Sequence, residues 1–221
     1  MKNILKLENY ELLNQKVYRV LKNAIIRGDL APNSKLSLQE IAKSLKISTT
    51  PVREAINKLE SEGFVKITPN RGIKIEKINI DDIQEILQIR AFLDGLIAKL
   101  ATKKISDKEI DKLMEIINEM EHCVKEDDRL VYNDLDIQFH DFILNISGNG
   151  RLKEIYNNLI SHAQRFRIRT LKIPDRMSKS FQEHRDIAFA IKERNCDEAN
   201  KLSQIHIENI LKSILEDEKR G

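Results

Sequence analysis

The stretch that decides the fold is Ser48–Val65, which reads STTPVREAINKLESEGFV. Four apolar residues recur in it at three- and four-residue spacing: Val52, Ala55, Ile56 and Leu59. This spacing predicts a helix with one buried face. Pro51 suits the first turn, because proline lacks an amide hydrogen that would have no partner there. Gly63 ends the helix, and the apolar run after it predicts a strand.

Two more helices are predicted upstream. The first ends at Gly28 and has apolar residues at helical spacing: Leu13, Val17, Val20, Leu21, Ala24 and Ile25. The second opens with Ser37-Leu38-Gln39-Glu40, a capping box in which Ser and Glu satisfy each other's backbone amides. It is expected to bury Leu38, Ile41, Ala42 and Leu45. Downstream, residues 64–67 and 73–75 are predicted as two strands around a turn at 69–72.

Three short helices followed by a basic hairpin is the element order of a winged helix-turn-helix. A helix-turn-helix places the N-terminal part of its second helix in the major groove, where base edges can be distinguished. Eight residues are therefore predicted to contact DNA: Ser48, Thr49, Thr50, Arg53, Asn57, Arg71, Gly72 and Lys74. The alternative is that the Ser and Thr residues only cap the helix and Arg53 is a surface residue. Capping alone does not account for the hairpin and the element order together.

The formal net charge of +3 is the sum of two unlike parts. Residues 1–77 carry 15 Lys and Arg against 8 Asp and Glu, whereas residues 78–221 carry 23 against 27. A basic first part favours contact with a polyanion, although composition alone also fits a solvated surface. Residues 73–147 contain no proline and one glycine, which predicts long helices. We therefore predict two domains, 1–77 and 78–221, in a mainly α fold.

The first domain resembles a known family. Residues 48–56 (STTPVREAI), residues 59–65 (LESEGFV) and Gly72 look like the GntR family of bacterial transcription regulators, and residues 17–28 fit its opening helix. Thr49 stands where the family usually has an arginine that often reads a guanine, so the operator sequence stays open. Asn33 replaces a usual glycine, but asparagine tolerates the same left-handed backbone.

The second domain is predicted to be an all-α antiparallel helical bundle, in which polar residues interrupt the apolar faces. His140, His184 and His206 fall at core-facing positions of three helices. Asp136 lies one turn before His140 on the same face. Each histidine alone is more typical of a hydrogen-bonded core residue. Together, three imidazoles and a carboxylate suit a divalent metal such as Zn²⁺, Ni²⁺, Mn²⁺ or Fe²⁺.

This second domain also carries a resemblance. Residues 136–141 (DIQFHD), 147–149 (SGN) and 183–187 (EHRDI), with the late His206, are similar to the all-helical FCD ligand domain of the FadR-like branch. Residues 90–94 (RAFLD) resemble its opening Arg-x-x-Leu-Glu, with Asp in place of Glu. The resemblance implies that Asp136, His140, His184 and His206 hold a metal that helps bind a small carboxylate effector.

Three residues are predicted to contact that effector: Arg90, Asn149 and Arg167. Arg90 shares a face with apolar residues, and a partly buried guanidinium needs an anion. That anion is either Asp94, one turn on, or the effector carboxylate, which matches the guanidinium fork bidentately. Arg167 is expected to turn inward from a basic run that is otherwise a solvated face.

The sequence thus predicts a cytoplasmic DNA-binding repressor that is not an enzyme. We expect a homodimer on a pseudo-palindromic double-stranded operator, with operator affinity lowered by the carboxylate. A catalytic metal is a rival hypothesis, but no general base is aimed at the site, because Glu183 is expected to point elsewhere. Two rival hypotheses keep the regulator: the metal is itself the signal or purely structural, or the effector is a bulky acyl thioester.

The location follows from two negative observations on the sequence. No apolar stretch approaches the roughly 18–20 residues needed to span a bilayer, so no membrane contact is expected. Cys123 and Cys196 are too few for a disulfide framework, which favours a reducing compartment.

Overall fold

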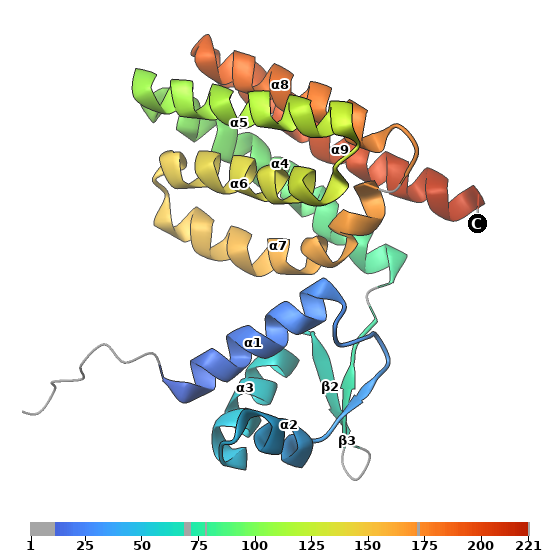
Figure 1. The fold of residues 1–221 in the computed structure, drawn as a ribbon. Helices are drawn as coiled ribbons and strands as arrows, with labels where there is room; N and C mark the ends of the chain where they lie inside the picture. Colours follow the sequence, from blue (N-terminus) through green and yellow to red (C-terminus); the bar gives the residue numbers. More distant parts are fainter. Residues whose placement is uncertain (1–11, 69–71, 78, 172, 221) are drawn as a thin grey trace, which may run out of the picture. The chain divides into compact units, whose positions relative to one another are not determined.

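The computed structural model describes residues 12–68, 72–77, 79–171 and 173–220, and it confirms a mainly α fold. The chain divides into two compact units, Met1–Lys77 and Ile78–Gly221 (Figure 1). Each unit has its own apolar core. In the described ranges, no helix is both long and apolar enough to cross a membrane.

The first unit is a winged helix-turn-helix. Its elements, in chain order, are α1 (Leu13–Arg27), β1 (Lys35–Leu36), α2 (Leu38–Leu45), α3 (Thr49–Ser61), β2 (Val65–Thr68) and β3 (Gly72–Ile75). The three strands form one antiparallel sheet in the order β1-β3-β2. α3 buries the four apolar residues that the sequence singled out, and they pack with Phe64 in the core. Asn33 has a φ of 66°, so it adopts the left-handed conformation expected of it.

Some local predictions for this unit were wrong. Leu45, which was expected to be buried, is 37% exposed, and Leu13 and Val20, which share the helical spacing of α1, are 48% and 52% exposed. The reason is that α1 packs through a narrow stripe that recurs every four residues, Val17, Leu21 and Ile25. The two-residue strand β1 was not predicted, because so short a segment forms only by pairing with β3.

The second unit is entirely helical in its described residues. Its elements are α4 (Ile80–Lys104), α5 (Asp107–Glu126), α6 (Arg129–Ser147), α7 (Gly150–Leu171), α8 (Arg176–Lys192) and α9 (Cys196–Arg220). Capping boxes open α4 at Asn79 and α5 at Ser106. Gly148 ends α6 with a φ of 61°.

The long helix α4 organises this unit. It packs most extensively against α9 and also contacts α6, α7 and α8 (Figure 1). The cluster Ile83, Leu87, Ala91, Ala163, Ile207 and Ile214 joins α4, α7 and α9 in one small apolar core. α4 therefore carries Arg90 and Asp94 into the middle of the bundle, where both side chains are buried.

Candidate metal centre and nucleic-acid interface

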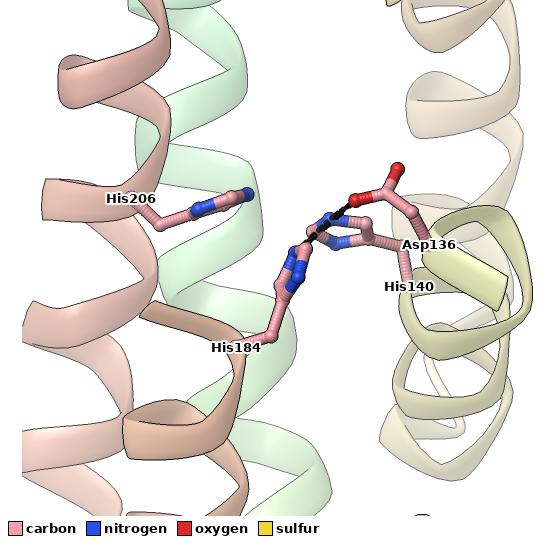
Figure 2. A group of neighbouring side chains, drawn as sticks. All are labelled: Asp136, His140, His184 and His206. Atoms are coloured by element: carbon pink, nitrogen blue, oxygen red, sulfur yellow. Dashed lines mark hydrogen bonds and ion pairs between the residues drawn. The ribbon is translucent and has the colours of Figure 1, made fainter. Parts of the chain in front are cut away.

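Four ligand-type side chains from three helices meet inside the second unit. Asp136 and His140 come from α6, His184 from α8 and His206 from α9, and they point toward one another (Figure 2). Their ligand atoms all lie within 4.8 Å of one another. The one-turn spacing on α6 puts its two side chains on the same face. The structure thus brings together all four residues that the sequence nominated as metal ligands.

The inner atoms of the cluster are imidazole nitrogens and one carboxylate oxygen. His184 Nε2 lies 3.3 Å from His140 Nε2 and 3.2 Å from Asp136 Oδ1. The Nε2 atom of His206 is buried and has no hydrogen-bond partner among the described residues. A buried nitrogen without a partner costs free energy unless something binds it. The donor set fits a divalent cation, which would bind these nitrogens and Asp136 at once.

Each of the three histidines meets a polar group on its outer side. His206 Nδ1 lies 2.7 Å from Glu183 Oε2, and His184 Nδ1 lies 3.2 Å from the hydroxyl of Tyr132. His140 Nδ1 is 3.8 Å from Asp94 Oδ2. A partner on Nδ1 fixes the tautomer and orientation of a ring, leaving Nε2 free to bind a metal. The hydrogen bonds on Nδ1 of His184 and His206 therefore leave the Nε2 atoms of these two rings facing the common centre, where His140 Nε2 lies 3.3 Å from His184 Nε2.

Burial keeps His140 and His184 in the neutral form that binds metals. Burial and the charge of Arg90 hold the pKa of His140 well below its usual value, and burial with His206 lowers the pKa of His184 to about 3. Burial opposes ionisation of Asp136, but the positive groups around it, Arg167 foremost, together outweigh burial and leave the pKa of that carboxyl below its ordinary value. Asp136, His140 and His184 thus offer deprotonated ligands at neutral pH.

Two of the predicted effector residues border this cluster. Arg90 Nε lies 3.2 Å from Asp94 Oδ2, and Arg90 Nη2 lies 3.4 Å from His140 Nε2. Burial raises the pKa of Asp94, and the adjacent Arg90 opposes that rise. Arg167 turns inward, with Nη1 at 3.0 Å from Asp136 Oδ2. Asp94 is therefore the anion beside Arg90 in this structure, while both arginines also face a cavity.

The cavity lies beside the cluster and encloses about 490 Å³ of space, part of it open to solvent. Its charged and imidazole lining comes from five side chains: Arg90, Asp136, His140, Arg167 and Arg176. Apolar residues of α4, α7 and α9 form the rest of the wall together with Thr170 and Ser180. A small anion could enter it and reach both the cluster and the arginines.

Asn149, which was predicted to contact the effector, does not line this cavity. Its Oδ1 accepts a hydrogen bond from the amide of Leu152, so the side chain caps the start of α7. It lines a different surface pocket, with Leu100 and Lys104. The tight turn between α6 and α7 accounts for this position, because the first amides of α7 need an acceptor.

Glu183 was misjudged from the sequence. It does not point elsewhere, because its carboxylate contacts His206, the buried Arg176 and Asn209. Burial opposes ionisation of Glu183, but His206 and Arg176 outweigh it and lower its pKa to about 2. Such a carboxylate holds a ring in place and is a poor proton acceptor. The available signal was the seven-residue spacing of Arg176 and Glu183, which puts them on one face of α8.

In the first unit, most residues predicted to contact DNA are accessible. Ser48, Thr50, Arg53 and Asn57 are exposed at or near the start of α3, and Thr49 is half-buried. Gly72, with a φ of 86°, begins β3 and Lys74 is exposed within it, while Arg71 lies outside the described residues. The capping expectation was wrong for Ser48, whose side chain takes no capping hydrogen bond in the described structure. The amides at this helix end therefore stay available to an anion.

Sequence reasoning overlooked two lysines of the sheet. Lys74 on β3 pairs in register with Lys35 on β1 and with Lys66 on β2, and all three side chains are exposed. Like charges opposite each other on a sheet destabilise it unless an anion is near. This row of lysines extends the basic surface of the hairpin. It could not be recognised from the sequence, because it depends on the pairing of β1 with β3.

The chain joins a winged helix-turn-helix to a helical unit that contains a buried cluster of ligand-type side chains. This combination defines a class of two-domain transcription regulators. Comparison with known proteins gives the family. Residues 13–75 match "Bacterial regulatory proteins, gntR family", and residues 85–209, more than half of the chain, match the FCD domain. The chain belongs to the GntR family of transcriptional regulators with an FCD domain, which are DNA-binding proteins and not enzymes. The first domain implies DNA binding and the second a small-molecule effector.

Named relatives agree with this assignment. The chain is 25% identical over 202 residues to the HTH-type transcriptional repressor RspR of Escherichia coli, covering 91% of this chain and 89% of that protein. It is 29% identical over 189 residues to the Nta operon transcriptional regulator of Aminobacter aminovorans, covering 84% and 86%. The solved structure of E. coli McbR/YncC has the same fold, with a TM-score of 0.76 at 19% identity over 90% of this chain and 95% of that one. The metal-free FCD domain of TM0439 covers 66% of this chain and 99% of its own, with 20% identity and a TM-score of 0.54.

Proposed function

We propose that this regulator is a homodimeric repressor whose C-terminal unit holds a divalent metal and, with it, a small carboxylate that lowers operator affinity. The observation that carries the proposal is the convergence of three Nε2 atoms and one carboxylate oxygen, with an outer polar group at every Nδ1 atom. Four protein ligands leave a coordination position open if the metal is five- or six-coordinate.

The charge balance around the cluster favours an anionic effector. Three buried or nearly buried arginines each pair with a carboxylate: Arg90 with Asp94, Arg167 with Asp136 and Arg176 with Glu183. Within each pair the two charges offset each other, and His140 and His184 beside them are neutral. A divalent cation would therefore add two positive charges that the pairs do not offset. Buried charge without compensation is unfavourable, so a carboxylate would stabilise the loaded site.

The chain's own residues would then orient the acid. The metal, when bound, supplies a Lewis-acid position for one carboxylate oxygen. Arg90 and Arg167 line the cavity beside His140 and Asp136, so their guanidinium groups would bind and align the other oxygen. The buried surroundings exclude bulk water and strengthen these interactions.

The DNA-binding unit would place the start of α3 in the major groove. Thr49 and Arg53 would meet base edges or phosphates there, and Gly72 and Lys74 would bring the hairpin to the backbone. Lys35 and Lys66 would add phosphate contacts beside Lys74. Because Thr49 replaces an arginine, we expect an operator that differs from those read by an arginine at this position.

An apolar stripe on α4 supports the homodimer. Ile89, Phe92 and Leu96 are exposed at successive turns of one helix face, and Phe92 is 72% exposed. A second copy of the chain is the occupant we propose, because two-fold symmetry sets the same stripe against itself and presents two copies of α3 to a two-fold operator. Phe92→Asp is expected to yield monomers in analytical ultracentrifugation.

The proposal is tested on the purified full-length protein. We expect one divalent metal per chain by elemental analysis, and none in the double variant His140→Ala/His184→Ala. His122→Ala removes an exposed histidine of α5 and serves as the matched control. Operator duplexes selected from a random pool would then be titrated with and without acetate, hexanoate and citrate.

The outcomes separate an acid sensor from a metal sensor. Lower operator affinity with acid in the loaded wild type, but not in the double variant, supports the proposal. Identical operator affinity of the two proteins under all conditions would refute the sensing role. A change in operator affinity caused by the metal alone, without further change on adding acid, would make the metal itself the signal.

A further inference from the structure

The cavity beside the metal cluster has two chemically different ends. Arg90, His140 and Arg167 lie on one side, against the cluster. The other wall contains Thr170 and Ser180 but consists mainly of aliphatic side chains of α4, α7 and α9: Ile83, Leu87, Ala163, Leu171, Ile210 and Ile214. A cavity meant only for a small, fully polar acid would not require this second wall.

The two helices that line the length of the cavity, α4 and α9, both change from polar to apolar residues along it. Along α4, Arg90 is followed toward the start of the helix by Leu87 and Ile83, on the same face. Along α9, His206 is followed toward the end of the helix by Ile210 and Ile214. At 1.5 Å rise per residue, Arg90 to Ile83 spans about 10 Å and His206 to Ile214 about 12 Å.

The two gradients run in the same direction in space. Ile83 packs with Ile214 in one apolar cluster, whereas Gly95 lies against Asn200 and Gln204. α4 and α9 are therefore antiparallel, and the apolar start of α4 faces the apolar end of α9. The remaining charged lining residue, Arg176, belongs to the metal end, because it binds Glu183, which contacts His206.

We propose that the effector is a monocarboxylic acid with an apolar body, which reaches about 10 Å from its carboxylate along α4 and α9. This inference rests on the proposed function, since it assigns the carboxylate to the metal and the arginines. The aliphatic body would lie among Ile83, Ile210 and Ile214. A second carboxylate, or the hydroxyls of a sugar acid, would lie unpaired against these side chains, which is unfavourable.

The test is calorimetric titration of the full-length, zinc-loaded protein with acetate, butanoate, hexanoate, octanoate and citrate. Each methylene buried against the aliphatic wall is expected to tighten binding about fourfold, which corresponds to ~0.8 kcal/mol per CH₂. Affinity should therefore rise through octanoate, and citrate should bind no better than acetate. A thermal-shift series with the same acids gives a second readout that does not depend on DNA.

Matched variants locate the apolar wall. Ile210→Asn is expected to remove most of the chain-length dependence while acetate still binds. Ile155→Asn makes the same change at an exposed isoleucine of α7 and should leave the dependence intact. Ile210→Phe fills the cavity without adding a polar group, so affinity should stop rising at a shorter chain than in the wild type.

Each outcome either supports or overturns the inference. A rise with chain length that Ile210→Asn or Ile210→Phe removes or shortens supports it. Binding of acetate or citrate as tight as that of octanoate would overturn it and leave the proposed function standing. A rise that survives both Ile210 variants would also overturn it, because the chain then binds elsewhere. Failure of every acid to bind the zinc-loaded protein would overturn the proposed function together with the inference.

Discussion

The two units of this regulator use positive side chains in opposite ways. In the first unit, Arg53 and Lys74 project from α3 and the hairpin into solvent. In the second unit, the side chains of Arg90 and Arg176 are 4% and 3% exposed, and each meets a carboxylate. Exposed cations attract a polyanion at long range and are screened by salt. Buried, paired cations have their charge offset inside the protein, where salt screens it much less.

The comparison teaches where each unit is vulnerable. Removing an exposed charge changes what the protein binds and barely affects folding. Removing one partner of a buried pair leaves a charge in the interior and affects folding first. Four variants, taken from the largest expected effect to the smallest, test this difference.

The largest effect is expected for Glu183→Ala. It leaves Arg176 buried without its carboxylate, which should lower the free energy of unfolding of the second unit by about 3–5 kcal/mol. It also removes the group on His206 Nδ1, so metal affinity should fall about 10- to 100-fold. The control is Glu154→Ala, which breaks an exposed pair with Arg151 and should cost under ~1 kcal/mol. Equal melting temperatures for the two variants would contradict the proposed role of burial.

Glu62→Gln tests a partly buried charge in the first unit. Glu62 accepts hydrogen bonds from the Tyr18 hydroxyl and from Lys22 Nζ, and so ties α1 to the end of α3. Losing the charge should cost about 1.5–3 kcal/mol at pH 7, measured by hydrogen exchange in α1 and α3. This is less than the cost expected for Glu183, because Lys22, the cationic partner of Glu62, is 14% exposed, whereas Arg176 is 3% exposed.

The same variant has a pH dependence of defined sign. Burial opposes ionisation of Glu62, but Lys22 and Tyr18 outweigh it and leave its pKa below the ordinary value of 4.5. A lowered pKa means that the stabilisation is complete above 4.5 and disappears as the pH falls through the lower folded value. The difference in free energy of unfolding between wild type and variant should therefore be largest at pH 7 and should shrink below pH 4.5. If this difference in free energy of unfolding instead grows on acidification, the ionised carboxylate of Glu62 is not the stabilising form.

Arg53→Ala should affect DNA binding and not folding. We expect a loss of about 1–3 kcal/mol in operator affinity, roughly five- to a hundred-fold, by fluorescence anisotropy. Arg151→Ala removes an exposed arginine from the second unit and should leave operator affinity unchanged. If Arg53→Ala also leaves it unchanged, α3 does not read the operator through this residue.

The smallest effect is expected for Lys74→Ala. A single phosphate contact lowers affinity only modestly, but its loss should reduce the slope of log K against log salt by about one. Lys103→Ala, in the second unit, should not change the slope. A slope equal to that of the wild type in Lys74→Ala would exclude the lysine row from the phosphate contacts.

Much of the fold was predictable because its signals are local. The apolar spacing in α3, the capping box at Ser106 and the breaker-poor stretch after residue 73 depend on neighbours within a few residues. β1 was missed because a two-residue strand has no local signal and forms only against β3. Val20 was misplaced because helical spacing shows which residues share a face, but not how wide a face the partner helix covers.

The metal cluster was predictable for a similar reason. Asp136 and His140 lie one turn apart, and His184 and His206 interrupt apolar faces, so the ligand types and their inward direction follow from the sequence together with its resemblance. The outer contacts were not predictable. Tyr132 and Glu183 meet the histidines across helices, so these pairings depend on how the helices pack. The Asn149 cap of α7 is a local contact with the amide of Leu152, three residues on, and was overlooked.

By itself, the sequence determined a basic winged helix-turn-helix, a helical second domain and four inward side chains of ligand type, because periodicity, caps and charge are local properties of the chain. Only the tertiary structure decided which arginine meets which carboxylate, which nitrogen of each imidazole faces the centre, and that one wall of the cavity is aliphatic. These features depend on residues far apart in sequence, such as Ile83 and Ile214, which meet only when α4 and α9 pack antiparallel.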